Sequence, residues 1–306
     1  MRQRLKAWLA PIILATGLTP AMATGAGAAE SKSAGKSALE AYFAFDDGKS
    51  ISVSNIGSYG AALLGGVRFA KDSDGNPQSL ALDGRSGSAV VADAKGLRVT
   101  ESFTLSAWVI LGDARRLQVI VAKDRPLRPH TTNYSLTVRD GRLQIETTFA
   151  ANRVDVADMK NGAAVCNVPA MTCILRSAKP VDLNRWRHVA AVWDATSGLM
   201  RLYVDGRPDA TVRYSFNGKA PALRTSSAAL RIGARNREGA GAWLAGRIDA
   251  VCLWRRPLSG SEIKEVIQGG CQYDTSTGDG FADGAAGDRK PAQSARKGDE
   301  KPADKS

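Results

Sequence analysis

The chain has 306 residues with 31 glycines, a net charge of +12 and a sequence pI near 9.7. Abundant glycine and the lack of long helical periodicity favour an all-β protein, and the length suits one large β domain or two smaller ones. No repeat of fixed period is present, which argues against a propeller or a solenoid. The charge alone would allow an acidic polymer or nucleic acid as a partner, but the export predicted below argues against nucleic acid.

The first 23 residues have the pattern of a secretory signal peptide. Three basic residues (Arg2, Arg4 and Lys6) precede an apolar segment, residues 7–18, which is too short to span a bilayer comfortably. Small residues at 21–23 supply a cleavage site. We therefore expect a periplasmic or secreted protein of a Gram-negative bacterium without a stable membrane span, and an uncleaved membrane anchor is the alternative.

Two flanking segments are poor in large apolar side chains. Residues 24–38 and 274–306 are rich in small and charged residues, and they bury too little to offset the entropy of ordering. They predict a flexible lead-in and a disordered charged tail on either side of one domain at residues 39–273.

Short apolar runs separated by turn residues follow one another through this domain. They are residues 41–45, 66–70, 79–82, 103–111, 117–122, 134–138, 143–149, 186–193, 199–204, 230–233 and 243–254. So many short strands at regular spacing predict two antiparallel sheets packed face to face. Residues 150–182 have the least regular pattern and are interpreted as an insertion.

The clearest pattern is the stretch from Trp186 to Gly206, which predicts a hairpin in the middle of a sheet. In both apolar runs of this stretch, the two alternating sets of side chains are apolar, which is typical of strands covered on both faces. Asp205-Gly206 has the preferred sequence of a type I′ turn, because glycine accepts the positive φ that the turn requires.

A short helix is expected near the C-terminal end of the domain. Ser259 and Glu262 have capping-box spacing, and Gly269-Gly270 is a suitable end. The apolar face of this helix consists of Ile263, Val266 and Ile267.

Four cysteines lie beyond the signal segment: Cys166, Cys173, Cys252 and Cys271. An even number in an oxidising compartment predicts two disulfide bonds, for which the sequence allows three pairings. The pairs Cys166–Cys173 and Cys252–Cys271 are favoured because each closes a short loop. A zinc site is the alternative, but the sequence has no C-x-x-C motif.

Eight landmarks stand in order over residues 40–268: AYFAFDDG, SLALDG, FTLSAWV, YSLTVRDGRL, WRHVAAVWD, LMRLYVDGR, LRIGA and GRIDAVCLWRRPLSGSEI. Together they resemble the laminin-G-like domains of the concanavalin A-like lectin/glucanase superfamily. The resemblance implies that the two antiparallel sheets form an all-β jelly-roll sandwich. It does not decide the function, because this fold hosts lectin modules, glycosidases and adhesion domains.

The resemblance also implies a structural calcium ion, held by groups near the exit of the first strand and by an acidic residue of the last strand. The matching positions are Asp46, Asp47, Gly84 and Asp249. Asp249 lies in an otherwise apolar strand, and a buried carboxylate needs a cation or several hydrogen-bond donors. The alternative is that Asp249 pairs with an arginine or accepts backbone N–H bonds.

Catalysis is not expected. Glycosidases of this superfamily carry an E-x-D-x-x-E motif on one strand, and the sequence contains no such motif. Glu146 lies on an expected strand, with no carboxylate two or four residues further on. A Ser-His-Asp triad would need His130 or His188, and the resemblance gives His188 a structural role.

Candidate ligand-binding residues come from a basic group and from aromatic side chains. A basic cleft favours acidic glycans, and exposed aromatic rings stack on sugars. Trp243 follows a loop rich in glycine and alanine, and Tyr214 is expected in a polar loop. The basic group on and around one expected strand consists of Arg115, Arg116, Lys123, Arg125 and His130.

These observations predict an exported, non-catalytic binding module for carbohydrate or an acidic surface polymer, with calcium as a structural ion. A protein-interaction or adhesion domain is the first alternative. A glycoside hydrolase with an unrecognised site is the second.

Overall fold

The computed structural model describes residues 38–45, 52–53, 59–71, 77–125, 131–167, 170–235 and 242–271. Its elements are β1 (Leu39–Ala44), β2 (Ser52–Val53), β3 (Ala61–Leu64), β4 (Val67–Lys71), β5 (Pro77–Asp83), β6 (Ser88–Val91), the 3-10 helix η1 (Lys95–Leu97), β7 (Phe103–Leu111), β8 (Gln118–Arg125), β9 (Thr131–Arg139), β10 (Arg142–Thr148), β11 (Asp155–Lys160), β12 (Ala163–Asn167), β13 (Thr172–Pro180), β14 (Arg187–Asp194), β15 (Leu199–Val204), β16 (Arg207–Ser215), β17 (Leu230–Ile232), β18 (Ala245–Trp254) and α1 (Gly260–Gly269). The expected signal segment and the expected tail lie outside the described residues. Within those residues, no helix has the length and apolar character needed to cross a membrane.

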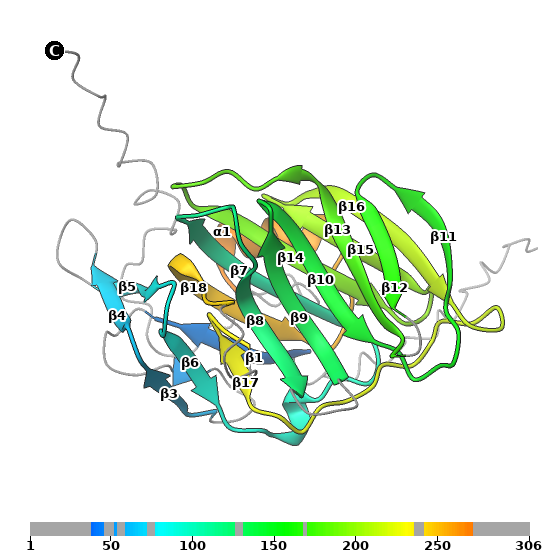
Figure 1. Cartoon of the computed structure of the whole chain (residues 1–306), viewed down its shortest axis with the longest axis horizontal. Helices are drawn as coiled ribbons and strands as arrows, with labels where there is room; N and C mark the ends of the chain where they lie inside the picture. The colour runs from blue at the N-terminus through cyan, green and yellow to red at the C-terminus, as the bar shows by residue number, and fades with distance from the viewer. Residues whose placement is uncertain are drawn as a thin grey trace, which may run out of the picture. The chain divides into compact units, whose positions relative to one another are not determined.

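The strands form two antiparallel sheets (Figure 1). Sheet A has the order β11-β16-β15-β14-β7-β18-β1-β2, with β5 also paired to β18 and β4 to β5. Sheet B has the order β12-β13-β10-β9-β8-β17-β6-β3, and its central strands lie in front of sheet A in Figure 1. The predicted two-sheet jelly-roll sandwich is therefore confirmed.

The core lies between the two sheets and uses every second residue of their strands. Phe103, Leu105 and Ala107 of β7 enter it from sheet A, and Tyr134 and Leu136 of β9 enter it from sheet B. The rings of Phe103 and Tyr134 meet with centroids 5.7 Å apart. Each large side chain buried in this way stabilises the sandwich by roughly 1.5–3 kcal/mol.

The stretch predicted as a central hairpin forms β14 and β15 in the middle of sheet A. Val189 of β14 enters the core between the sheets, whereas Val192 packs in a second apolar cluster on the outer face. The strands are therefore apolar in both alternating sets because both faces are covered. Asp205 and Gly206 have φ values of 48° and 71°, as a type I′ turn requires, and connect β15 to β16.

Helix α1 covers part of the outer face of sheet A. Its predicted capping box is present, since the Glu262 N–H donates to Ser259 Oγ at 3.2 Å and the Ser259 N–H donates to Glu262 Oε2 at 2.7 Å. Ile263 and Val266 point down from the helix into the outer apolar cluster. The cap fixes where the helix begins, and these two side chains fix which face meets the sheet.

Both favoured disulfide pairings are confirmed. Cys252 of β18 is bonded to Cys271, two residues beyond the end of α1, so the helix is attached covalently to sheet A. Cys166–Cys173 joins directly opposite residues of β12 and β13 at the edge of sheet B.

The interpretation of residues 150–182 as an irregular insertion is wrong, because β11, β12 and β13 occupy most of this segment. β11 pairs with β16 at the edge of sheet A, and β12 pairs with β13 at the edge of sheet B. All six residues of β11 are exposed, so its sequence lacks the alternation that marks a half-buried strand. Asp158 has a φ of 49° where the pairing is irregular, which hinders the addition of a further strand.

Candidate functional site

The outer face of sheet B carries a row of side chains that crosses the whole sheet. Residues paired directly opposite each other in neighbouring strands point to the same face, so the register defines the row. From β3 to β12 the row reads Ala62, Val90, Arg231, Ala122, Ser135, Glu146, Ile174 and Val165. Its centre is polar and its end at β12 is apolar.

A hydrogen-bonded group lies at the centre of this row. Arg235, in the segment after β17, donates from Nη2 to Glu146 Oε2 at 2.5 Å, and Thr132 Oγ1 donates to Glu146 Oε1 at 2.8 Å. The side chains of Arg235 and Glu146 are only 15% and 16% exposed. Charge-assisted bonds in a poorly solvated position are strong, so these three residues, the Glu146 group, form a fixed polar feature.

A β-bulge in β9 brings Thr132 to this face. The register between β8 and β9 shifts at Asn133, whose buried side chain turns away and binds another segment. Asn133 Oδ1 accepts the Val99 N–H at 2.8 Å, and Asn133 Nδ2 donates to the Val99 carbonyl at 2.7 Å. The extra residue reverses the alternation of the residues before it, so Thr132 and Ser135 share the outer face although they are three residues apart.

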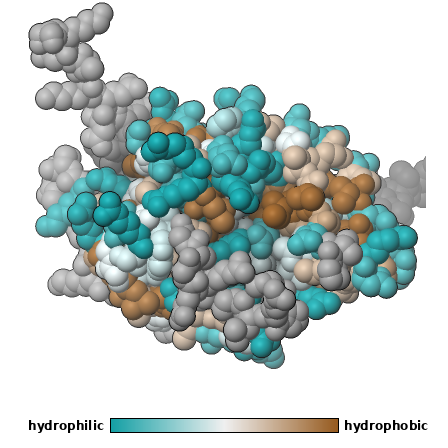
Figure 2. All heavy atoms as spheres, viewed as in Figure 1, coloured by the Kyte–Doolittle hydropathy of each residue, from teal (hydrophilic) through white to brown (hydrophobic). Residues whose placement is uncertain are grey.

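Apolar side chains continue the outer face toward the edge of sheet B. Ile174 is half-buried, and Val165, directly opposite on β12, is 61% exposed. Thr172 and Asn167 form the adjoining pair on the same face. Figure 2, viewed from the side of sheet B, shows apolar residues gathered between hydrophilic ones. This face therefore offers hydrogen-bonding groups and apolar surface side by side.

The segment that precedes β18 brings Trp243 close to this face. Ala242 packs against Val119 and Ala122, the latter a member of the row. The Leu244 N–H donates to the Gly233 carbonyl at 2.9 Å, which holds the segment beside β17. Trp243 is half-buried between these two anchors, so this predicted ligand residue lies beside the outer face of sheet B.

The predicted basic group is not one cluster. β8 separates Arg116 from Arg125, and a strand of this length places its two ends roughly 23 Å apart. The Arg115 side chain is 92% exposed in the link between β7 and β8, and Arg125 is exposed at the other end of the strand. His130 lies outside the described residues.

Lys123 was predicted to bind the ligand, but its side chain is fully buried. Its Nζ donates to Asp93 Oδ1 at 2.6 Å and to the Ala228 carbonyl at 2.7 Å. Burial lowers the pKa of Lys123, whereas hydrogen bonds from Arg98 and then from Lys123 lower the pKa of Asp93. Lys123 therefore ties β8 to the neighbouring segments and does not face solvent.

The described members of the predicted calcium set do not come together. Asp83 pairs with Ala245, so Asp249 lies four residues along β18 from the level of Asp83 and Gly84, a separation of roughly 13 Å. The Gly84 carbonyl accepts from Arg116 Nη2 at 2.8 Å, and Asp249 Oδ1 accepts the Ala250 N–H at 2.7 Å. No metal-binding group of three or more histidine, cysteine, aspartate or glutamate residues occurs in the described part of the chain.

Asp46 and Asp47 lie outside the described residues, just after the buried Phe45. Calcium binding at the exit of β1 therefore stays a prediction. The described residues do not fit a single site that joins Gly84 to Asp249.

Two further expectations concern buried rings. Tyr214 was expected in a loop, but it lies in β16, is 1% exposed and packs against Phe149 with ring centroids 5.3 Å apart. His188 is buried in β14, and its ring meets that of Trp108 edge-on at 5.4 Å.

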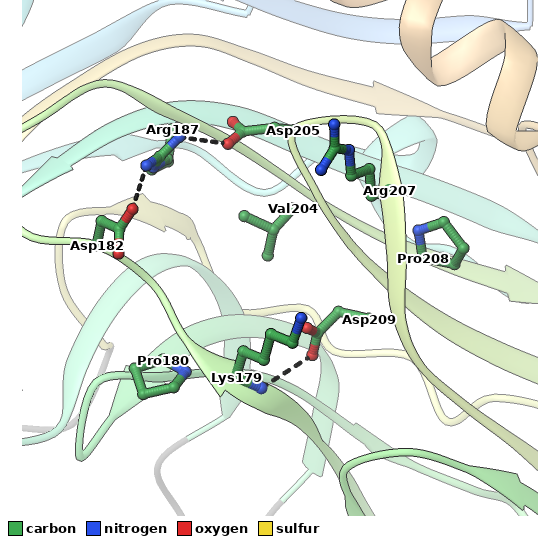
Figure 3. Close-up of a pocket in the computed structure, with 9 residues that line it drawn as sticks. All are labelled: Lys179, Pro180, Asp182, Arg187, Val204, Asp205, Arg207, Pro208 and Asp209. Atoms are coloured by element: carbon green, nitrogen blue, oxygen red, sulfur yellow. Dashed lines mark hydrogen bonds and ion pairs between the residues drawn. The ribbon is translucent and has the colours of Figure 1, made fainter.

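A pocket of about 560 Å³ opens between the end of β13 and the β15–β16 turn, so it joins the two sheets (Figure 3). Its lining residues are Lys179, Pro180, Asp182, Arg187, Val204, Asp205, Arg207, Pro208 and Asp209. The sequence reasoning missed this pocket because two separate segments build it. The predicted Asp205-Gly206 turn, followed directly by Arg207, was the one feature of the sequence that could have pointed to a site here.

The three carboxylates of this pocket are all engaged by donors of the protein itself. Arg187 pairs with Asp182 and, with Nη1 at 2.7 Å from Oδ2, with Asp205. Asp209 Oδ2 accepts the Ala178 N–H at 2.5 Å and the Lys179 N–H at 3.4 Å. These bonds fix the walls of the pocket.

The family model of the concanavalin A-like lectin/glucanases superfamily matches residues 83–264, which is more than half of the chain. The chain belongs to this superfamily. No curated protein sequence matches this superfamily member.

Solved structures with a similar fold include toxin binding domains. The binding domain of Paraclostridial Mosquitocidal Protein 1 has 13% sequence identity and a TM-score of 0.52, over 74% of this chain and 51% of that one. The binding domain of botulinum neurotoxin serotype D/C has 12% identity and a TM-score of 0.52, over 75% and 51%. The superfamily domain thus spans about half the length of these structures, and at this identity the likeness shows the fold alone.

A third similar structure is of botulinum neurotoxin type C, which enters cells in a manner dependent upon interaction with two ganglioside molecules. Its identity is 13% and its TM-score is 0.52, over 74% of this chain and 50% of that one.

Proposed function

We propose that the protein is an exported, non-catalytic module that binds carbohydrate on the outer face of sheet B. The observation that carries the proposal is the position of the fixed Glu146 group directly beside the partly exposed pair Ile174 and Val165. A sugar ring has apolar C–H surface edged by hydroxyl groups, so it needs both kinds of partner next to each other.

Features beside this face add to the proposal. Trp243 is half-buried next to β17 and supplies an aromatic ring, the side chain on which sugar faces stack. Arg235 Nε is a buried donor without a hydrogen-bond partner among the described residues, and a ligand oxygen would satisfy it. The two disulfide bonds support an oxidising compartment, and hence export.

The similar toxin structures support a binding role, since their names describe binding domains. One of the toxins interacts with gangliosides, which are carbohydrate-bearing lipids. The superfamily also includes glucanases, so the lack of catalysis is part of the proposal. A structural calcium ion at Asp46 and Asp47 is a further part of it.

A glycan array with the full chain, followed by calorimetric titration of the strongest neutral oligosaccharide, tests the proposal. Ile174→Ala removes apolar surface from the proposed face and should weaken the affinity about fivefold, which corresponds to about 1 kcal/mol. Val156→Ala on β11 is the matched control, because Val156 is 46% exposed but lies at the edge of sheet A. The control should bind like the unchanged protein.

Glu146→Gln probes the polar half of the same face. The amide retains the shape and one acceptor for Thr132, but it loses the charge that holds Arg235. We expect at least a tenfold loss of affinity with the fold intact by circular dichroism. The absence of any saturable glycan signal would overturn the proposal in favour of a protein-interaction domain, and release of shorter sugars during incubation would show a hydrolase.

A further inference from the structure

In the pocket of Figure 3, the acidic side chains and two of the basic ones differ in whether they have partners within the described part of the protein. Its carboxylates Asp182, Asp205 and Asp209 all accept bonds from protein donors. Among the described residues, the side chains of Lys179 and Arg207 form no ion pair and no hydrogen bond, and both residues are exposed. The ionic side chains of the pocket without a partner in the described ranges are therefore both cations.

The positions of these two cations are set by the backbone on which they lie. Arg207 directly follows the Asp205-Gly206 turn, whose positive φ values direct the chain into β16. Lys179 lies near the end of β13, and its N–H is bonded to Asp209 on β16. One cation thus comes from each sheet. The hydrogen bond from the Lys179 N–H to Asp209 links β13 to β16.

Apolar surface separates the charged groups of the pocket. Val204, Pro180 and Pro208 line it together with the cations. Proline and valine side chains are rigid and give a ring-shaped ligand an apolar wall at little entropic cost. A volume of about 560 Å³ lies within the range of small-ligand sites.

Two further arginines lie beyond the pocket. The Gly141 N–H donates to the Ala114 carbonyl at 2.8 Å, and the Val181 N–H donates to the Gly141 carbonyl at 2.8 Å. These bonds bring the β7–β8 link, with Arg115 and Arg116, to the same end of the sandwich as the pocket. Both arginines lie near Asp113, with Arg115 Nε 3.4 Å and Arg116 Nε 3.8 Å from its carboxylate oxygens, so a polymer extending from the pocket would meet two cations and one carboxylate there.

We propose that this pocket is a second binding site, which takes the carboxylate of an acidic sugar residue in a polysaccharide. Arg207 presents a planar guanidinium that binds a carboxylate through two parallel bonds, and Lys179 adds a second positive charge. Val204 and the two prolines cover the apolar side of the sugar ring. The site is separate from the outer face of sheet B and extends the function from neutral to acidic sugars.

A metal ion is a poorer occupant of the same pocket. Arg187 pairs with both Asp182 and Asp205, and backbone donors engage Asp209, so an entering cation would have to compete with these bonds. It would also meet the unengaged charges of Lys179 and Arg207. The carboxylate oxygens of the pocket are therefore already bonded, whereas its two cations without a partner among the described residues are open to an anionic ligand group.

Calorimetric titration of the full chain with a short oligogalacturonate, and with its carboxyl-reduced neutral form, tests this site. We expect the acidic form to bind at least tenfold more tightly, with an affinity that falls as salt concentration rises. Arg207→Gln should remove about tenfold of the affinity for the acidic form, and Lys179→Gln about threefold. Arg207→Lys should lie between, because it keeps the charge without the planar fork.

Arg68→Gln is the matched control, since Arg68 is exposed on β4 and the change in charge is identical. All four variants alter exposed side chains, so unchanged melting temperatures will show that they fold. Equal binding of the acidic and neutral forms would overturn the second site, as would equal effects of Arg207→Gln and Arg68→Gln. If a sulfated oligosaccharide binds and the oligogalacturonate does not, the site recognises sulfate, which would also contradict the proposal.

The two proposals fail separately. Ile174→Ala affects neutral sugars if the outer face of sheet B binds them, whereas Arg207→Gln affects the additional affinity for the acidic form. If Ile174→Ala has no effect on neutral sugars, the effect of Arg207→Gln on the acidic form can still be measured. If Arg207→Gln has no effect, that of Ile174→Ala can still be measured.

Discussion

The outer faces of the two sheets are built from the same alternating pattern but are used in opposite ways. On sheet A, Ala190 and Val192 lie under Ile263 and Val266 of α1, and a disulfide bond secures the helix. On sheet B, the corresponding face holds the Glu146 group and a partly exposed apolar edge. A face that is covered by its own chain serves stability, whereas a face that mixes organised polar groups with open apolar ones is available for a ligand.

The same substitution on each face gives the largest expected difference. Ile263 of α1 is 1% exposed against sheet A, so Ile263→Asp places a carboxylate in an apolar cluster and should cost about 4 kcal/mol of unfolding free energy. Ile174 is half-buried and borders solvent, so Ile174→Asp should cost about 1 kcal/mol or less. Urea denaturation followed by fluorescence measures both, and equal losses would contradict the distinction between the faces.

Removal of the bond that holds α1 should have the next largest effect. The double variant Cys252→Ser, Cys271→Ser opens a loop with a sequence separation of 19, for which chain entropy gives about 3 kcal/mol. The matched variant Cys166→Ser, Cys173→Ser opens a loop with a separation of 7, and its loss should be smaller. Thermal unfolding of the two variants under identical conditions tests this order, which a larger loss for the shorter loop would refute.

Removal of calcium tests the proposed ion near the exit of β1. With free calcium at 100 times its dissociation constant, binding would contribute about 2.7 kcal/mol. We therefore expect a chelator to lower the melting temperature and added calcium to restore it. An Asp46→Asn, Asp47→Asn variant should not respond to the chelator, and an unchanged melting temperature of the unmodified protein would remove calcium from the proposal.

Acid should weaken the protein through Asp93, which lies between β6 and η1 and binds Lys123 of β8. Hydrogen bonds from Arg98 and Lys123 hold the pKa of Asp93 below its ordinary value, so the unfolded chain binds more protons near pH 4. This contribution is present above the ordinary aspartate pKa and is lost as the pH falls through the lower folded value. Asp93→Asn should cost about 1–2 kcal/mol at neutral pH and should flatten the decline below pH 4, which melting curves across pH measure.

Much of sheet A was predictable because its central strands are apolar in both alternating sets. The hairpin around Asp205-Gly206, the capping box at Ser259 and both disulfide pairings follow from local spacing. Local signals of this kind depend on residues that are near one another in the chain.

The candidate sites were less predictable, because they depend on contacts between distant residues. Arg235 and Glu146 are separated by 89 residues, and no local pattern marks their ion pair. The bulge at Asn133 reverses the alternation that places Thr132, and the burial of Lys123 depends on Asp93 and Ala228. The sequence identifies the cationic residues, but it does not show which of them lack an acidic partner in the folded protein.

The disulfide bond at the edge of sheet B fixes the register in which β12 and β13 pair. Cys166 and Cys173 are directly opposite each other, so their bond locks β12 and β13 at a single offset. A slip of one residue would turn Val165 and Asn167 toward the interior and bring cysteine to the solvent side. A reducing medium would remove this covalent lock, so that only the backbone pairing of β12 with β13 would hold the apolar border in register.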